Sequence, residues 1–462
     1  MKQSIIIILI FFINLSSFGQ EVESLTFEQA LSRMNNQNYS LKSAEANKRS
    51  HELERKTMRG FYLPKVSLSA TYMKFNEDIG LDITPISDAY RNLSGVPDQK
   101  QLPSTLVLQN EDFSMIGINF LWPVFTGGKI RAANQAMDAN INNSLYQIEQ
   151  KKNELNTELV ERYYGYRLSI KAVGLYKEAY DAMLIHLDHA QKMEENGMIS
   201  KAQRLYVEFS ASNAKMEWQK SIKQANTVKE ALSNTIGDSI EVQPISELFL
   251  LKQIESVDFF QQAAVENNPL LKQVESKKNL AKANYNIQRS DYLPTVAIVG
   301  NKELYQQDLS HLVPNWFIGV NLRWTIFDGV SRTYKVKSAK ATMNMVEYID
   351  NKAKSDIATY INKLYNELQM HVEQMTTMEK TYQFANEYLR VQKKAFAEGF
   401  ATSKDVVDAE LTVNKVKIGR VKVMNDYVLS LAKLLEFSGQ TNLFLQYSLR
   451  ADREKEDFPE TK

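Results

Sequence analysis

The sequence predicts a mainly helical fold with a small β part, and the first reason is that the chain contains one unit twice. Tyr62-Leu63-Pro64 recurs as Tyr292-Leu293-Pro294, at an offset of 230 residues, and farther along an offset of 202 pairs Trp122 with Trp324. Constant offsets of this kind predict the same architecture in both halves. The second reason is that each half combines long proline-free stretches with short stretches of alternating polarity. The expected layout is a signal peptide at 1–20, a first repeat at 21–237, a linker at 238–256, a second repeat at 257–439 and a C-terminal tail at 440–462.

Composition excludes several classes of protein. The 56 basic and 55 acidic residues leave a net charge of +1, which gives no reason to expect a nucleic-acid partner. The absence of cysteine excludes disulfides, thiolate metal sites and a cysteine nucleophile. Lys2, an apolar run from Ile5 to Ile13 and small residues up to Gly19 have the order of a secretory signal. That run is too short to span a bilayer, so we expect the mature chain to lie outside the inner membrane.

Long helices are expected where proline is missing. Residues 332–398 hold neither proline nor glycine, and 129–196 hold no proline. From Leu145 to Leu187, apolar residues recur at steps of three and four, which is coiled-coil spacing. At ~1.5 Å per residue, each of these helices would reach roughly 100 Å. Shorter helices are expected at 39–60, 201–236, 269–290 and 403–437.

Alternating polarity predicts two strands in each repeat, at 65–75, 115–125, 295–302 and 316–326. One apolar face, one polar face and aromatic ends are typical of a transmembrane β-barrel strand. One such strand would also suit a soluble sandwich, but four of them with a signal peptide and no transmembrane helix favour the barrel. The expected lipid-facing side chains are Val66, Leu68, Ile116, Ile118, Phe120, Trp122, Val296, Ile298, Ile318, Val320, Leu322 and Trp324.

Four strands cannot close a barrel, and open strand edges are not tolerated in lipid. Several chains must then share one barrel. Two chains would give eight strands and a filled interior, whereas three would give twelve strands and a lumen. We therefore expect a trimer that forms a conduit.

Several segments together resemble the TolC-like outer-membrane efflux or channel-tunnel family, over nearly the whole mature chain. They are the repeated Tyr-Leu-Pro, the segments Phe125–Gly128 and Phe327–Gly329 between strand and long helix, and the segment Glu398–Ala409 at the far helical turn. The last segment is the most specific. Its glycine and small polar residues before Asp405-Val406-Val407-Asp408-Ala409 are similar to the family's periplasmic tip motif.

The resemblance implies a homotrimer with a twelve-stranded barrel in the outer membrane, a twelve-helix tunnel in the periplasm, and a collar formed by 238–256 and the C-terminal tail. It also implies a periplasmic adaptor (membrane fusion) protein and an inner-membrane pump as partners, with no enzymatic activity and no cofactor. The expected function is that of a passive exit duct of a tripartite efflux or type I secretion system. The alternative is a periplasmic coiled-coil adaptor or structural protein, which the duplicated strands disfavour.

Asp405 and Asp408 are the main candidate site. They stand three residues apart on one helix face, and threefold symmetry would gather six carboxylates in a tunnel-tip constriction able to bind cations. Thr402 with Asp405 also has capping-box spacing, and the two interpretations are compatible. The other expected tip residues are Gln203 and Tyr206, at the equivalent positions of the first repeat, and Gly197 and Gly399, at the helix turns that would contact the adaptor.

Other candidates are weaker. His186 and His189 share a helix face, but no acidic residue stands at ligand spacing, so a solvated pair is favoured over a metal site. No catalytic-triad order, phosphate loop or dinucleotide-binding pattern occurs. Residues 76–110 are expected to form a long outer surface loop, and 303–314 a shorter one.

Overall fold

The structure is a computed structural model that describes residues 23–94, 104–237, 242–310 and 312–455, so the predicted signal peptide lies outside the described residues. The chain forms two compact units. The helical unit comprises Met1–Ala46, Tyr146–Lys272 and Lys352–Lys462, and the sheet unit comprises Asn47–Leu145 and Gln273–Asn351.

The six helices that the sequence predicts have the expected lengths, and four shorter helices were not predicted. Their bounds are α1 (Phe27–Gln37), α2 (Tyr39–Gly60), α3 (Thr84–Ser94), α4 (Lys129–Glu195), α5 (Lys201–Ile236), α6 (Val257–Asn267), α7 (Pro269–Ser290), α8 (Ser331–Ala397), α9 (Ser403–Phe437) and α10 (Phe444–Lys455), with a 3₁₀ turn at Thr441–Leu443. The four that were not predicted are α1, α3, α6 and α10. Helices α4 and α8 agree with the predicted ranges to within one residue, because no proline interrupts them. Within the described residues, no helix is long and apolar enough to cross a membrane.

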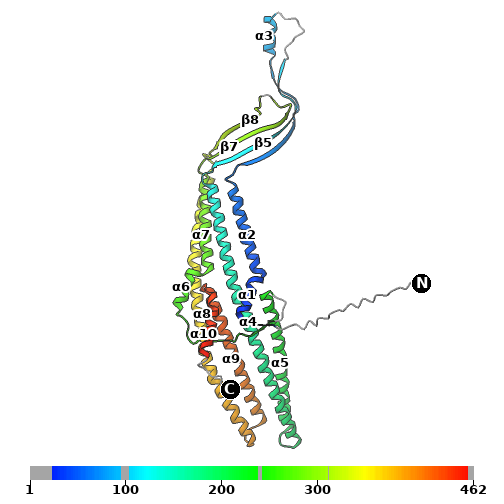
Figure 1. The fold of residues 1–462 in the computed structure, drawn as a ribbon, viewed down its shortest axis with the longest axis vertical. Helices are drawn as coiled ribbons and strands as arrows, with labels where there is room; N and C mark the ends of the chain where they lie inside the picture. Colours follow the sequence, from blue (N-terminus) through cyan, green and yellow to red (C-terminus); the bar gives the residue numbers. More distant parts are fainter. Residues whose placement is uncertain (1–22, 95–103, 238–241, 311, 456–462) are drawn as a thin grey trace, which may run out of the picture. The chain divides into compact units, whose positions relative to one another are not determined.

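The helical unit contains two helical hairpins. One is formed by the end of α4 with α5 and the other by the end of α8 with α9 (Figure 1). The short strands β1 (Glu23–Leu25) and β6 (Val242–Pro244) pair in parallel beside them. Since parallel strands need a long crossover connection, this pair links the start of the first repeat to the predicted linker.

An aromatic core holds the helical unit together. Phe27 of α1 contacts Tyr163 of α4 and Phe444 of α10, with ring centroids 5.5 and 5.1 Å apart. The Tyr163 hydroxyl donates to the Leu25 carbonyl at 2.6 Å and accepts from the Ile245 amide at 3.1 Å. A buried hydroxyl needs such partners, because an unpaired polar group in a core is costly. The hydroxyl therefore anchors both short strands to α4.

The same asparagine contact occurs in both repeats of the helical unit. Asn38, between α1 and α2, donates through Nδ2 to the Thr235 carbonyl near the end of α5 at 3.1 Å. Asn268, between α6 and α7, donates to the Phe437 carbonyl at the end of α9 at 2.7 Å. Carbonyls in the last helical turn lack partners within the helix. Each asparagine therefore caps the end of one helix at the start of another.

The sheet unit contains a four-stranded antiparallel sheet with the order β2-β5-β7-β8 (Figure 1). The strands are β2 (Lys65–Lys74), β5 (Asp112–Phe125), β7 (Thr295–Gln307) and β8 (Trp316–Arg323). The predicted fold class, long paired helices with a small duplicated sheet, is confirmed.

Three strand ends differ from the sequence expectation by three residues or more, and one is the start of β5, at Asp112 instead of near residue 115. Strand β7 continues to Gln307 instead of ending near residue 302, and its register with β5 shifts at Ile116/Gly117. A bulge of this kind breaks the period of two, so alternation could not reveal the extension. Strand β8 ends at Arg323, which pairs with Thr295 of β7. The residue before Thr295 is Pro294, which has no N–H to continue the ladder.

The prediction of a long loop at 76–110 is wrong in part, because this segment contains regular secondary structure. Strands β3 (Ile79–Asp82) and β4 (Thr105–Gln109) pair antiparallel, and α3 begins just after β3. The Asp82 carboxylate accepts from the Thr84 amide at 2.9 Å, which helps to start the helix. Short strands and one amphipathic helix among proline and glycine residues gave too weak a pattern to be predicted.

Candidate functional site: sheet face, junctions and helix tips

The strand register places the predicted lipid-facing side chains of β2, β5, β7 and β8 on one face of the sheet. Cross-strand partners share a face. Val66 pairs with Phe120 and Leu68 with Ile118. Further pairs on this face are Trp122 with Ile298, Ile298 with Val320, and Val296 with Leu322. Ile116 and Ile318 follow by alternation, and Trp324 lies one residue beyond the end of β8.

This apolar face is left uncovered by the rest of the described chain. Leu68 is 68% exposed and Val320 is 72% exposed. The opposite face carries a polar ladder in which Asn119 donates to the Ser69 hydroxyl at 2.8 Å and accepts from Asn301 at 3.2 Å. One face is therefore suited to lipid and the other to water.

The sheet also has two open edges. Strand β2 pairs only with β5, and β8 pairs only with β7, among the described residues. Unpaired backbone N–H and C=O groups along an edge attract another strand. Since β2 and β8 run in opposite directions, the β8 edge of one chain can pair antiparallel with the β2 edge of another.

A tryptophan at the base of the strands has the same contact in both repeats of the sheet unit. Trp324 Nε1 donates to the Tyr292 carbonyl at 3.1 Å, and Trp122 Nε1 donates to the Tyr62 carbonyl at 3.0 Å. These are the residues whose recurrence revealed the duplication. The repeated tyrosine therefore contributes its backbone carbonyl to a junction between strand and helix.

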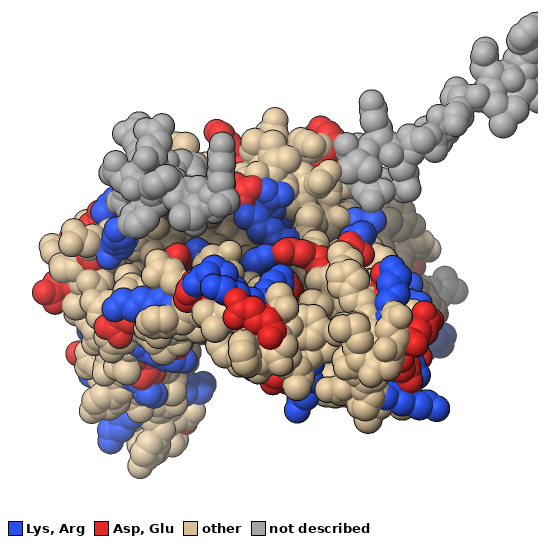
Figure 2. Space-filling model, turned by 90° about the horizontal axis from the view of Figure 1, so that it is seen from below, with Lys and Arg blue, Asp and Glu red and all other residues tan. Residues whose placement is uncertain are grey.

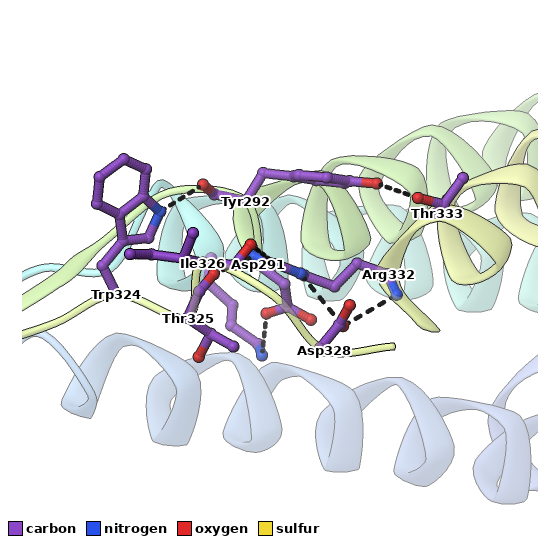
Figure 3. A network of polar contacts seen from close by, with 9 residues as sticks. Asp291, Tyr292, Trp324, Thr325, Ile326, Asp328, Arg332 and Thr333 are labelled. Carbon is purple, nitrogen blue, oxygen red and sulfur yellow. Dashed lines mark hydrogen bonds and ion pairs between the residues drawn. The ribbon is translucent and has the colours of Figure 1, made fainter. Parts of the chain in front are cut away.

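Arg332, in the first turn of α8, completes the second-repeat junction (Figure 3). Its guanidinium donates to the carbonyls of Asp291, Thr325 and Ile326, at 3.0, 2.6 and 2.9 Å. The Asp328 carboxylate lies 3.2 Å from Arg332 Nε and accepts from the Arg332 amide at 3.0 Å. The side chain thus binds two backbone acceptors between β8 and α8 and one between α7 and β7, which fixes the direction in which α8 starts.

The first-repeat junction uses a different side chain. The residue equivalent to Arg332 is Ile130. The neighbouring Lys129 instead reaches Asp291 of the second repeat, with Nζ 3.0 Å from Oδ1. Gly127 has a φ of +61°, and a Cβ there would lie 2.6 Å from the Ser290 carbonyl oxygen. The two junctions are therefore connected to each other inside the sheet unit.

The tips of the two helical hairpins have the same local structure. Gly197 and Gly399 end the long helices with φ values of +70° and +82°, the left-handed conformation that favours glycine. Ser200 with Gln203 begins α5 as a capping box. Thr402 with Asp405 does the same for α9. The capping role predicted for Asp405 is confirmed, and Gln203 performs the same role without charge.

Asp405 and Asp408 have separate partners within one chain. The Asp405 carboxylate accepts from the Thr402 hydroxyl at 2.6 Å and from the Thr402 amide at 2.8 Å. These hydrogen bonds hold the pKa of Asp405 below its usual value. Tyr206, the first-repeat equivalent of Asp408, donates its hydroxyl to the Asp408 carboxylate at 2.6 Å, and this bond raises the pKa of Tyr206. The Tyr206–Asp408 bond thus links α5 of one hairpin to α9 of the other.

His186 has an acidic neighbour on another helix, which the residues near His186 in the sequence could not reveal. The Glu410 carboxylate on α9 lies 3.7 Å from His186 Nε2 and 2.9 Å from Lys393 Nζ on α8. His186 and Lys393 lower the pKa of the half-buried Glu410 to about 2, although burial alone would raise it. Among the described residues, no group of three or more acidic or histidine side chains could hold a metal ion. The cluster is a second link between the hairpins.

Charges of both signs are interspersed over the face shown in Figure 2, without a large area of a single sign. This distribution agrees with the net charge of +1. Lys417 on α9 and Glu178 on α4, 2.6 Å apart, are one example of a pair that joins the two hairpins. Ion pairs at such exposed positions contribute little individually.

Comparison with known proteins identifies the fold. Residues 261–440 match the family model described as Outer membrane efflux protein. The outer membrane protein VceC of Vibrio cholerae superposes with a TM-score of 0.71 at 16% identity, over 89% of this chain and 96% of VceC. The MtrE outer membrane channel of Neisseria gonorrhoeae superposes with a TM-score of 0.71 at 14% identity, over 90% of this chain and 89% of MtrE. Long paired helices with a four-stranded sheet are thus the TolC-like fold of outer-membrane channels.

The family-model match lies almost entirely in the second repeat, whereas the structural superpositions extend over both repeats. The alkaline protease secretion protein AprF of Pseudomonas aeruginosa is 19% identical over 300 residues. That alignment covers 62% of this chain and 61% of AprF, so this chain spans about three fifths of the relative.

Several structurally important residues were not singled out by the sequence. Arg332, Asn38 and Asn268 act through backbone carbonyls that only the folded chain brings near them. The two asparagines did leave a signal, because they recur at the offset of 230 residues. Tyr163 also recurs, as Tyr365 at the offset of 202 residues, but the repeat does not reveal the hydrogen bonds of its hydroxyl.

Proposed function

We propose that three copies of this chain form a passive exit duct across the outer membrane. The observation that carries the proposal is the sheet, which has an uncovered apolar face, a polar face and two open edges. Edge pairing between three chains would leave no open edge and give twelve strands, enough for a lumen. The polar ladder around Asn119 would then face water inside the barrel.

In this proposal the duct serves a tripartite efflux or type I secretion system. The long hairpins of the helical unit would form the periplasmic tunnel, and the residues at 238–256 and 440–462 would form its collar. Gly197 and Gly399 mark the turns that would meet a periplasmic adaptor, which in turn would connect to an inner-membrane pump. AprF, whose name assigns it to alkaline protease secretion, supports the secretion branch.

Asp405 and Asp408 would line the narrow end of the tunnel. Asp405 caps its helix with one carboxylate oxygen, so its charge remains at the tip. Gln203 and Tyr206 occupy the same positions in the other hairpin. Three chains would therefore bring six carboxylates to one constriction, where multivalent cations would bind best.

Membrane fractionation tests the proposal. The full-length chain should be found in the outer membrane and migrate on gels as a trimer that boiling converts to a monomer. The purified trimer should conduct ions across a planar bilayer. A soluble monomer in the periplasm would contradict the proposal and favour an adaptor.

A further inference from the structure

The apolar face of the sheet carries one lysine that barrel formation alone does not explain. Lys302 follows Ile298 and Gly300 on the same face of β7, because alternate residues of a strand share a face. Its cross-strand partners are Ile118 and Trp316. The Lys302 side chain is exposed, and no residue of the described chain forms an ion pair with it.

The duplication fixes the position of Lys302 along the sheet. The offset of 230 residues between the two Tyr-Leu-Pro segments places Lys302 at the position of Tyr72. Tyr72 pairs with Ser114, and the offset of 202 places Trp316 at the position of Ser114. The cross-strand pairs Tyr72–Ser114 and Lys302–Trp316 therefore occupy equivalent positions, one rung of the sheet in each repeat. In each repeat, this rung holds one large aromatic side chain.

The rung lies at the loop end of the apolar face, away from the strand ends that join the helices. Trp316 and Trp324 bracket the apolar residues of β8 and are 62% and 56% exposed. At ~3.4 Å per residue and a tilt of ~40°, the distance between them covers about 20 Å of bilayer, comparable with the apolar band of ~25 Å in outer-membrane barrels. Aromatic residues favour both boundaries of that band. Lys302 therefore lies at the outer boundary, where a lysine keeps its stem in the apolar layer and its ammonium in the headgroups.

The second cation on this face differs from Lys302 in its surroundings. Lys74 lies 3.5 Å from the Glu111 carboxylate and 3.1 Å from the Asp112 carboxylate. Its charge is already balanced by protein groups. Lys302, next to an exposed indole and without a carboxylate partner among the described residues, has its charge available for an external anion.

We propose that Lys302 and Trp316 form a binding site, one in each protomer, for the phosphate group of an anionic lipid in the outer leaflet. The site rests on the proposed function, because it requires the apolar face to meet lipid. The ammonium would pair with the phosphate, while the indole would lie at the level where headgroup and acyl chain meet.

The test measures lipid binding to the full-length trimer in detergent by native mass spectrometry, with phosphatidic acid as the probe and phosphatidylcholine as the neutral reference. Lys302→Gln should weaken phosphatidic acid binding about five-fold, the effect of one basic residue near a membrane surface. Lys302→Arg should retain the affinity. Lys65→Gln is the matched control, because Lys65 is an exposed lysine on the opposite face of the same sheet.

Each outcome has a distinct meaning. Equal phosphatidic acid affinity in the wild type and Lys302→Gln overturns the site, and so does an equal loss in Lys65→Gln. Displacement of the lipid by millimolar inorganic phosphate overturns the assignment to a lipid and indicates a site for free phosphate. A chain that forms no detergent-stable trimer contradicts the proposed function itself, before any lipid is added.

Discussion

Two leucines show how the units differ. Leu159 on α4 is fully buried in the helical unit, whereas Leu68 on β2 is 68% exposed in the sheet unit. The helical unit contains the buried hydrophobic clusters of the described chain, although some of its apolar side chains, such as Phe384, are exposed; the apolar side chains on one face of the sheet are largely exposed. Exposed apolar surfaces of this extent mark a site of contact with a membrane or another protein. The contrast supports the proposal that lipid and further chains complete the sheet.

Truncation of each leucine gives the largest difference between the units. Leu159→Ala should destabilise the helical unit by about 2–5 kcal/mol, because it leaves a cavity in a packed core. Leu68→Ala should cost much less, since lipid can fill the space. Thermal unfolding of the two purified variants in detergent measures both effects. Equal losses would show that Leu68 is packed against protein.

A charge placed on each sheet face tests which face meets lipid. Val320→Arg should destabilise the trimer by ~2–4 kcal/mol near the membrane midplane, whereas its neighbour Asn321→Arg should be tolerated. Ile118→Arg and Asn119→Arg form a second pair, but Asn119 also bonds Ser69, so its replacement loses a contact as well. The measurement is the yield and thermal dissociation of the trimer. Similar behaviour of the Val320 and Asn321 variants would show that the face assignment is wrong.

The junction at Arg332 should respond more strongly than an exposed arginine of the same helix. Arg332→Gln removes hydrogen bonds to three backbone carbonyls, one part-buried and two exposed, so the expected total loss is about 1–3 kcal/mol. Arg390→Gln is the control, since Arg390, among the described residues, pairs with Glu387 of its own helix alone. Thermal unfolding compares the two variants. An equal effect on the unfolding temperature would show that the hydrogen bonds of Arg332 stabilise the fold no more than an exposed ion pair does.

The tips differ in charge but not in capping, which gives the smallest and most specific effect. Trivalent cations added from the periplasmic side should block conductance of the trimer, and Asp405→Asn with Asp408→Asn should abolish the block. Gln203→Ala is the control, because it removes the equivalent cap without changing charge. Single-channel recording measures the block. Block that survives the double substitution would show that the two aspartates serve only the start of α9 and do not line the constriction.

The sequence predicted most of the fold because its signals are local and occur twice. Missing prolines located α4 and α8, and alternation located the faces of the four strands. The end of β7 was missed because a bulge shifts the period, and the end of β8 because a proline on the neighbouring strand stops the ladder.

The candidate site was only partly predictable for a similar reason. The capping box of Asp405 follows from local spacing, so it was predicted. The bond from Tyr206 to Asp408 and the approach of Glu410 to His186 join residues that are far apart in the chain. The repeat aligned Tyr206 with Asp408, but alignment of equivalent positions does not reveal that they touch.

Cross-linking between the open edges of the sheet tests the shared barrel most directly. The chain has no cysteine, so one cysteine in β2 and one in β8 report only on that pairing. The set combines Val66→Cys, Leu68→Cys or Ala70→Cys with Ile318→Cys, Val320→Cys or Leu322→Cys. Oxidation of membranes should convert at least one combination, in one register, into covalent trimers that resist boiling and revert on reduction. Monomers in every combination would show that the edges do not pair and would contradict the shared barrel.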